Sequence, residues 1–218
     1  MLALEGITHR YRDGSTVSLP TWQGGSGEHW AIIGPSGSGK STFLHILAGL
    51  LRPAAGRIVV GDQELHRMGE RALDRFRGRH IGLVFQTLHL VAALTVTDNL
   101  RLARYFADLP RDDTRIRTVL GRLDIDELAD QYPHRLSQGQ AQRVAIARAL
   151  VNEPLTILAD EPTSALDDRN CRQVMALLTE QARESGASVI VATHDGRVRE
   201  YMEHTLELAP GTSEAHHA

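Results

Sequence analysis

The stretch HWAIIGPSGSGKST, residues 29–42, decides the fold class. Its first half, HWAIIG, is apolar and strand-like, and it runs directly into a glycine-rich turn. A helical pattern follows from about Lys40 to Leu51. A strand, a glycine-rich turn and a helix in this order bind anions, because the N–H groups of the turn and of the helix start point at the same place. The sequence therefore predicts an α/β core with a phosphate site at residues 34–42.

The turn contains the full pattern G-x-x-x-x-G-K-S. Its glycines let the backbone curl, the lysine supplies a charge for the β- and γ-phosphates, and the serine hydroxyl is a hard oxygen ligand suited to Mg²⁺. An ordinary glycine-serine turn before a helix would require neither the lysine nor the serine. We therefore predict that the chain binds a nucleoside triphosphate through Gly34, Pro35, Ser36, Gly37, Ser38, Gly39, Lys40, Ser41 and Thr42.

Strand-like and helical patterns alternate along the rest of the chain, which is typical of parallel strands joined by helices. Between Thr95 and Val151 helical patterns dominate and no strand signal is convincing. We expect one α/β domain over residues 1–218, with a mostly parallel sheet and a helical lobe inserted at 87–153. The further strand candidates are RIVVGD (57–62), HIGLVF (80–85), LTILAD (155–160) and ASVIVATHD (187–195).

The apolar strand candidate in LTILADEP, residues 155–162, ends in two adjacent carboxylates, Asp160 and Glu161. Successive side chains of a strand point to opposite faces, so the two carboxylates have different tasks. We assign Asp160 to the side of the metal ion and Glu161 to the water that attacks the γ-phosphate, since such catalysis needs mainly positioning and charge stabilisation. An acid-rich turn before a helix is the alternative, and it loses weight beside the phosphate loop.

Gln86 and His194 also follow strand candidates. Ligands of parallel sheets gather at the carboxyl ends of the strands, so both side chains fall where the nucleotide is expected. We predict that Gln86 reaches the metal ion or the attacking water, and that His194 reaches the γ-phosphate. Taken singly, each residue is an ordinary residue of a strand end.

The segment LSQGQ, residues 136–140, opens a further helical pattern in which Val144, Ala147, Leu150 and Val151 share one side. Ser137 is a plausible N-cap, and Gly139 frees the backbone in the first turn. A helix start of this kind offers unpaired N–H donors and a partial positive charge to an anion. The residues alone do not say which anion, and an ordinary capped helix remains the alternative.

Taken together, these motifs resemble the nucleotide-binding subunit of an ABC transporter. GPSGSGKST, Gln86, LSQGQ, LADEP, SALD (164–167) and His194 occur in the order and spacing of that family, over nearly the whole chain. The resemblance implies a P-loop NTPase core with a small antiparallel β region near the N-terminus. It implies ATP and Mg²⁺ as ligands, with Ser41, Gln86 and Asp160 near the metal ion and Glu161, Gln86 and His194 as the catalytic set.

The same resemblance implies a second subunit, expected to be identical. Two subunits would enclose two ATP molecules head to tail, so that Ser137, Gln138, Gly139 and Gln140 touch the partner's ATP and Asp167 helps each site to sense the other. Tyr11 matches the aromatic residue that stacks on adenine. One position departs from the family pattern L-S-G-G-Q, since Gln138 replaces the first glycine. A need for unusual backbone angles there would weaken binding across the dimer, although we expect activity to survive.

The bulk composition excludes several classes of protein. The formal net charge is −3, which gives no support to nucleic acid as the main partner. The single cysteine, Cys171, excludes an internal disulfide and fits a packed side chain in a reducing compartment. We see no signal peptide and no run of 18 apolar residues. The eleven histidines are scattered except for His216 and His217, so we expect no structural metal.

The expected second partner is an integral membrane permease, with the chain cytoplasmic and peripheral on the inner face of the cell membrane. VFQTLHLVAALTVTDNL and YPHRLSQGQAQRVAIARAL resemble cassettes of the lipoprotein-releasing, macrolide-exporting and cell-division group. Importer cassettes for amino acids are the alternative on the basis of DEPTSALD, and soluble ABC proteins of ribosomes or DNA are a third possibility. We expect the permease to dock on residues 87–105, through Leu88, Leu90, Val91 and Leu94 unless these belong to the core of the lobe.

Overall fold

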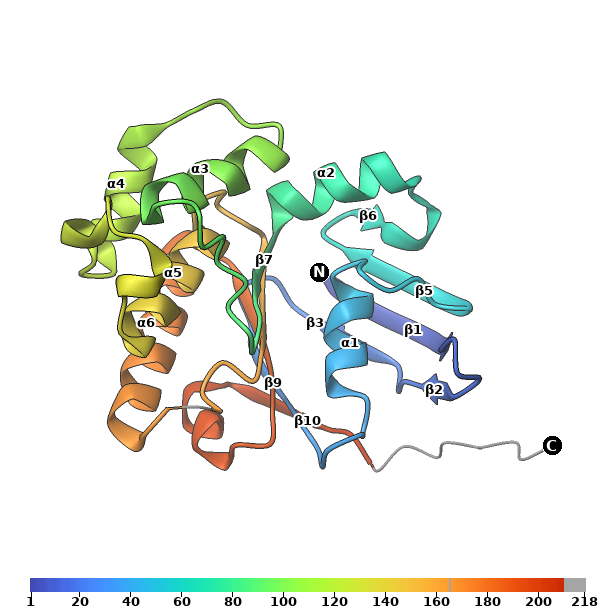
Figure 1. Cartoon of the computed structure of the whole chain (residues 1–218). Helices are drawn as coiled ribbons and strands as arrows, with labels where there is room; N and C mark the ends of the chain where they lie inside the picture. Colours follow the sequence, from blue (N-terminus) through green and yellow to red (C-terminus); the bar gives the residue numbers. More distant parts are fainter. Residues whose placement is uncertain (165, 210–218) are drawn as a thin grey trace.

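A parallel sheet of five strands forms the centre of the molecule (Figure 1). The computed structural model describes residues 1–164 and 166–209. Four of the strands follow runs that the sequence marks as apolar, whereas the fifth, β10, was not predicted because three of its four residues are exposed. The strand order is β10 (His204–Glu207), β4 (His29–Ile33), β9 (Ser188–Thr193), β8 (Thr156–Asp160) and β7 (Ile81–Val84).

A second, antiparallel sheet contains β1 (Leu2–Arg10) at its centre, as the family resemblance implied. The run RIVVGD does form a strand, β5 (Ala55–Val60), but this strand pairs with β1 and does not join the parallel sheet. The apolar ends of the two strands lie opposite each other, with Leu4 facing Ile58. Pairing with β1 buries the last three residues of β5. The sheet also holds β2 (Thr16–Ser18), β3 (Trp22–Gly24) and β6 (Gln63–Glu64).

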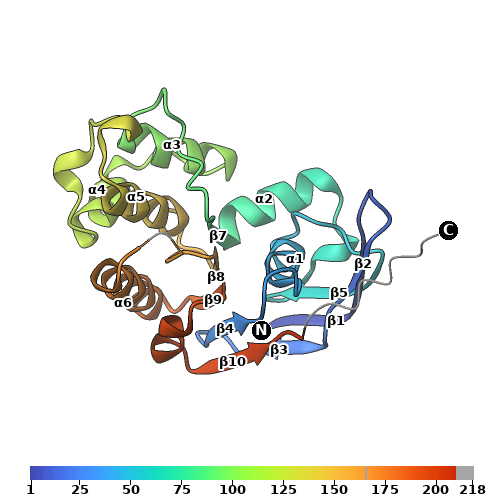
Figure 2. The same cartoon turned by 60° about the horizontal axis from the view of Figure 1, so that its bottom comes forward.

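Helix α1 (Lys40–Leu47) lies between the two sheets (Figure 2). Its side chains Phe43, Ile46 and Leu47 are fully buried in a core shared by both sheets. The helix is shorter than the predicted span because Gly49 adopts a positive φ of 65°. Two helices, η1 (Leu65–Arg67) and α2 (Glu70–His80), precede β7 in the chain. Two others, α6 (Asp168–Ser185) and η4 (Gly196–Tyr201), come directly before and after β9.

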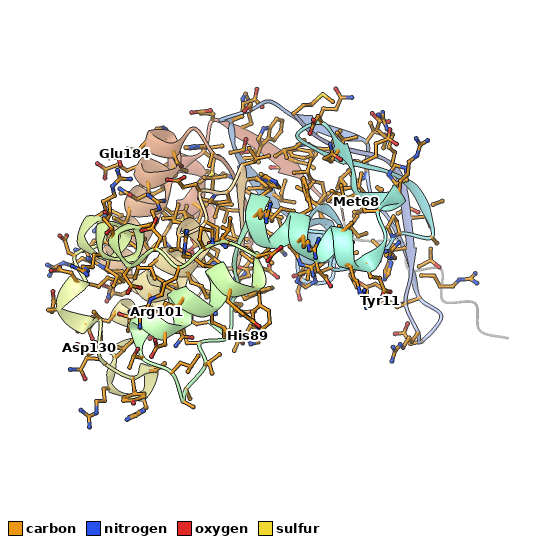
Figure 3. The ribbon with its side chains drawn as sticks, turned by 90° about the horizontal axis from the view of Figure 1, so that it is seen from above. Tyr11, Met68, His89, Arg101, Asp130 and Glu184 are labelled. Carbon is orange, nitrogen blue, oxygen red and sulfur yellow. The ribbon has the colours of Figure 1, made fainter. Side chains whose placement is uncertain are left out.

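Between β7 and β8 the described chain forms helices and loops, in agreement with the helical patterns of this region. Three helices of this region, α3, α4 and α5, each follow a residue whose side chain caps the helix start. The caps are Thr95, Asp112 and Ser137. In Figure 3, Arg101 and Asp130 of this part lie at the opposite end of the molecule from Tyr11. The limits 87–153 of a separate lobe stay a prediction. The elements are α3 (Val96–Phe106), α4 (Asp113–Arg122), η2 (Asp126–Leu128), η3 (Pro133–Arg135) and α5 (Gln138–Leu150).

Helix α5 packs tightly on strand β7. The four side chains that the sequence places on one side of this helix are all buried, in a core that includes Cys171. Burial raises the pKa of the Cys171 thiol, which fits a packed role for this residue. A Cβ atom on Gly82 would lie 2.6 Å from the backbone oxygen of Ala149, so only glycine allows this close approach.

Candidate functional site

The phosphate loop connects β4 to α1. Gly37 and Gly39 have positive φ angles of 79° and 93°, which glycine adopts without steric cost. Gly39 is the N-cap of α1 and offers no side-chain hydrogen bond, so the first N–H groups of this helix have no side-chain cap. Gly34 also needs to be glycine, because a Cβ atom there would lie 2.6 Å from the backbone oxygen of Leu208. The loop thus has the geometry of an anion site.

Lys40 lies inside the curve of this loop. Its ammonium group donates hydrogen bonds to the backbone oxygens of Gly34 at 2.8 Å and Pro35 at 3.0 Å, and only 8% of the residue is exposed. A buried ammonium group held by carbonyl oxygens stands ready to bind a stronger acceptor such as a phosphate oxygen. The role of Lys40 as a phosphate ligand stays a prediction, and its place inside the loop is compatible with that role.

Glu161 is held at several of its polar atoms. Its φ is +48°, a strained value for a side chain of this size, and its N–H donates to the oxygen of Ala192 at 2.8 Å. One carboxylate oxygen, Oε2, accepts a hydrogen bond from Thr193 at 2.8 Å. The other, Oε1, lies 2.8 Å from Nδ1 of His194 and accepts from the backbone N–H of His194 at 3.2 Å. The two predicted catalytic residues of β8 and β9 are thus in direct contact.

One cleft of about 610 Å³ is lined by the three predicted catalytic residues and by most of the predicted nucleotide-binding residues, but not by Gly34, Pro35 or Ser38. Across this cleft, the hydroxyl of Tyr11 lies 2.6 Å from that of Thr42. Val17 of β2 also lines it, 3.2 Å from where a Cβ atom of Gly39 would stand, and no local sequence signal identifies this valine. The predicted residues in its lining are Tyr11, Ser36, Gly37, Gly39, Lys40, Ser41, Thr42, Gln86, Glu161 and His194.

The predicted cross-dimer residues are not part of that lining among the described residues. Ser137 accepts a hydrogen bond from the N–H of Gln140, whose side chain accepts from the N–H of Ser137, so the two form a capping box. Gln138 is the first helical residue of α5 and is exposed. Asp167 is the N-cap of α6. The signature residues and Asp167 therefore lie at the starts of α5 and α6, outside the cleft that the phosphate loop lines.

The backbone at the signature removes the concern raised by Gln138. Neither Gln138 nor Gly139 has a positive φ, so the glutamine creates no strain. A Cβ atom on Gly139 would meet no atom within 4 Å in residues 1–164 and 166–209. Gly139 thus does not adopt the positive φ that glycine makes available at this position.

Comparison with known proteins identifies the family. Residues 20–164 match the protein family described as ABC transporter. The chain belongs to the ABC transporter ATP-binding family. This ABC cassette is therefore an ATP-binding and ATP-hydrolysing enzyme, and its parallel and antiparallel sheets confirm the fold that the resemblance implied.

Individual relatives extend this result. The cassette is 37% identical to the lipoprotein-releasing system ATP-binding protein LolD of Chromohalobacter salexigens, over 97% of this chain and 92% of that protein. It is 43% identical to the macrolide export ATP-binding/permease protein MacB of Escherichia coli O157:H7, over 85% of this chain but only 29% of that longer protein.

Solved structures show the same fold. The dimeric structure of MJ0796, described as a bacterial ABC transporter cassette, superposes with a TM-score of 0.88 and 35% identity, over 98% of this chain and 97% of that one. A second dimeric structure of MJ0796, a post-hydrolysis state bound to ADP and Pi, matches equally well.

One residue beside Glu161 and His194, the predicted catalytic pair of this ABC cassette, was not predicted. Asp195 follows His194, and its carboxylate accepts hydrogen bonds from Arg197 and, at 3.1 Å, from the hydroxyl of Thr163. The Arg197 guanidinium is the main cause that lowers the pKa of Asp195 to about 2. Asp195 is therefore ionised at neutral pH and fixes the loop that follows β9.

Proposed function

We propose that two copies of this cassette bind ATP and close around it, and that closure moves a membrane permease. One observation carries the proposal: the cleft gathers the phosphate loop, Gln86, Glu161 and His194, whereas the signature helix start lies outside it and is exposed. A single chain thus holds one complete phosphate site and one further anion-seeking helix start. In a head-to-tail pair, the phosphate site of each copy would face the signature helix start of the other copy.

The residues near Asp160 fit Mg²⁺. Oδ1 of Asp160 is buried and has no hydrogen-bond partner among the described residues, as expected for an oxygen that faces a cation or its water shell. Ser41 and Gln86, which add a hydroxyl and an amide oxygen, line the adjoining cleft. These are the hard oxygen donors that Mg²⁺ prefers. Bound there, the ion would neutralise charge on the β- and γ-phosphates.

Catalysis then depends on Glu161 and His194. Glu161 accepts the proton of the attacking water, and His194 contacts the γ-phosphate. Their contact at 2.8 Å places both at the same end of the cleft. Lys40 and the loop N–H groups hold the nucleotide in line with the attacking water, which is the larger part of catalysis in phosphoryl transfer.

The signature binds the partner's ATP in this proposal. Gly139 supports it, since the described chain leaves open space where a side chain at this position would lie. A helix start with free N–H groups attracts a γ-phosphate that approaches from outside. Asp167, at the start of α6, would face the other subunit in the same closure.

Ser137→Arg is expected to spare ATP binding by the single chain and to block closure. The arginine would place a bulky side chain where the partner's nucleotide must approach, and it would remove the capping box of α5. Nucleotide affinity by fluorescence titration and the ATP-dependent dimer by size-exclusion chromatography measure the two effects separately. Arg135→Ser, nearby but outside the helix start, is the control. An ATP-driven dimer of the Ser137→Arg variant would contradict the sandwich.

We assign the permease to the release and export type, on the basis of the lipoprotein-releasing and macrolide-export relatives. Importers of amino acids and soluble proteins of ribosomes or DNA are not favoured by these relatives. No helix within residues 1–164 and 166–209 is long and apolar enough to cross a membrane. In this proposal the cassette works against the permease on the inner face of the cell membrane.

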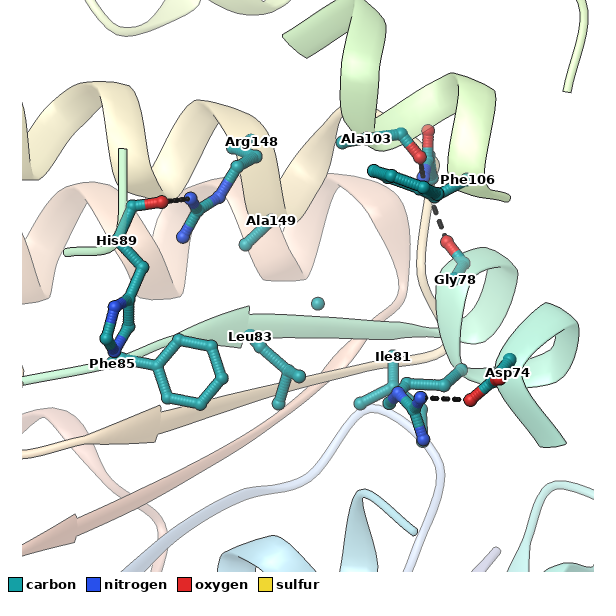
Figure 4. Close-up of a pocket in the computed structure, with 13 residues that line it drawn as sticks. Asp74, Gly78, Ile81, Leu83, Phe85, His89, Ala103, Phe106, Arg148 and Ala149 are labelled. Atoms are coloured by element: carbon teal, nitrogen blue, oxygen red, sulfur yellow. Dashed lines mark hydrogen bonds and ion pairs between the residues drawn. The ribbon is translucent and has the colours of Figure 1, made fainter. Parts of the chain in front are cut away.

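A groove of about 460 Å³ between β7, α2, α3 and α5 is the proposed docking site for the permease (Figure 4). Its floor is apolar. Ile81 and Leu83 come from β7, Phe85 follows this strand, and Ala149 comes from α5. Of the segment 87–105 that the sequence predicted for docking, only His89 and Ala103 line this groove.

Phe106 gives a direct test of this function. It lines the groove and is 68% exposed, whereas its neighbour Tyr105 is 74% exposed and is not part of the lining. Phe106→Asp, placed in a Glu161→Gln background with ATP, is expected to lose the permease from native membranes at least tenfold, and Tyr105→Asp is expected to retain it. Mass spectrometry identifies the captured chain. A ribosomal or DNA-bound partner, or equal capture by both variants, would contradict the proposal.

A further inference from the structure

The side chain of Thr193 links the catalytic strand ends. Thr193 is the last residue of β9 and is fully buried. Its hydroxyl oxygen accepts a hydrogen bond from the N–H of Asp195 at 2.9 Å and lies 2.8 Å from Oε2 of Glu161. A backbone N–H can only donate, so the proton of the hydroxyl is free to point at Glu161. The hydrogen bond from Thr193 to Glu161 therefore has a fixed direction.

The two oxygens of Glu161 have contacts of different kinds. Oε2 is held by a buried hydroxyl, whereas Oε1 is held by His194, whose side chain is 66% exposed. An exposed histidine can turn towards a nucleotide, but a buried threonine on a central strand cannot. When the His194 side chain turns to the γ-phosphate, Oε1 loses its contact with the imidazole and keeps only the backbone N–H of His194 at 3.2 Å, whereas Oε2 remains bound to Thr193.

We propose that Thr193 is a positioning residue for Glu161, which fixes Oε2 so that Oε1 faces the attacking water. In the step that follows, Oε1 takes one proton from the water, the water oxygen forms a bond to the γ-phosphorus, and the bond from that phosphorus to the bridging oxygen breaks with its electron pair left on ADP. The carboxylate returns its proton to solvent afterwards. This inference rests on the proposed role of Glu161 as the base.

The strained backbone of Glu161 supports this role. A non-glycine residue at positive φ persists only where its surroundings determine its position. The N–H of Glu161 is fixed by Ala192, and its backbone oxygen accepts from the hydroxyl of Ser164 at 3.1 Å. Thr193 adds the only buried hydroxyl on the carboxylate in the described part of the chain. The carboxylate thus depends on Thr193 for its direction.

The loop behind Thr193 is itself anchored. Asp195, whose N–H holds the Thr193 hydroxyl, is bound by Thr163 and by Arg197. Arg197 in turn forms an ion pair with Asp168, the first residue of α6. The position of Thr193 is therefore connected to the helix start that carries Asp167.

Thr193→Val tests the inference, because valine keeps the shape and removes the hydroxyl. We expect the turnover number to fall about tenfold or more, with ATP affinity and the thermal midpoint nearly unchanged. Thr193→Ser is expected to restore most of the rate. Thr156→Val is a matched control, since Thr156 is fully buried on the adjacent strand and its hydroxyl has no partner among the described residues. A wild-type rate in Thr193→Val would overturn the inference; if this variant does not fold, Thr193→Ala takes its place.

A double variant, Thr193→Val with Glu161→Gln, shows whether Thr193 acts through the Glu161 carboxylate or affects hydrolysis independently. The residual single-turnover rate of Glu161→Gln should change less than twofold when Thr193→Val is added, because Thr193 acts through the carboxylate. An equal fall of this rate in both backgrounds would overturn the inference. The proposed function fails differently: rapid hydrolysis by Glu161→Gln alone would remove Glu161 as the base, whatever Thr193→Val does.

Discussion

Replacement of Glu161 by glutamine is expected to lower the rate of ATP hydrolysis about a thousandfold, a typical loss for a missing general base. ATP binding should persist, because the phosphate loop and Lys40, which are proposed to hold the nucleotide, are unchanged in this variant. Glutamine has nearly the same shape and still accepts the hydrogen bond from Thr193. The variant should therefore accumulate as an ATP-bound dimer.

Glu153 offers a matched control for this substitution. Glu153 also has a positive φ, of 53°, but it lies outside the lining of the nucleotide cleft and forms an ion pair with Arg115. Phosphate release measured for Glu153→Gln should stay near the wild-type rate. Light scattering in the presence of ATP measures the dimer. Fast turnover by Glu161→Gln, or its failure to dimerise with ATP, would contradict the proposed mechanism.

Lys40→Ala is expected to weaken ATP binding about a hundredfold. The ammonium group is nearly buried inside the loop, where two hydrogen bonds to charged phosphate oxygens are worth about 3 kcal/mol in total, or a factor of about a hundred. Hydrolysis should fall with binding. Unchanged affinity would remove Lys40 from the site.

An unusual feature of the composition gives a second, independent test of the contact between Lys40 and the nucleotide. Lys40 is the only lysine among the 218 residues. An amine-reactive reagent therefore modifies one side chain at most, and mass spectrometry of the peptide that contains it reports the occupancy of the loop. ATP should protect this side chain in the wild type. Ser137→Arg, which leaves the loop intact, should show the same protection and serves as the control.

Local motifs were sufficient to predict most of the nucleotide cleft. GPSGSGKST determines its own conformation through glycines at positive φ, and Gln86, Glu161 and His194 follow apolar strands whose ends meet at one edge of the sheet. The residues that were missed depend on pairing between distant segments. Val17 reaches the loop only because β2 pairs with β1, and Thr193 reaches Glu161 only because β8 and β9 are neighbours.

The fold shows the same division. β4, β7, β8 and β9 are dense in apolar residues, because both faces of a parallel sheet are covered, and each was predicted. β10 is a largely exposed edge strand, so no apolar run marks it. The strand at 57–62 was predicted, but its sheet was not, since local sequence says nothing of the register with Leu2 to Leu4.

Because α5 packs closely on β7, we expect this helix to move as a rigid rod. Its last turn carries Arg148 and Ala149 in the proposed docking groove, and its first residues form the signature, about 18 Å away at 1.5 Å per residue. Because α5 packs closely on β7 where Ala149 meets Gly82, a load applied in the proposed docking groove would tilt the helix as a unit. A tilt of only about 5° would shift its far tip by about 1.5 Å, half the length of a hydrogen bond. Movement of the permease at one end of α5 would then be coupled mechanically to the contact between the signature and the partner's phosphate at the other end.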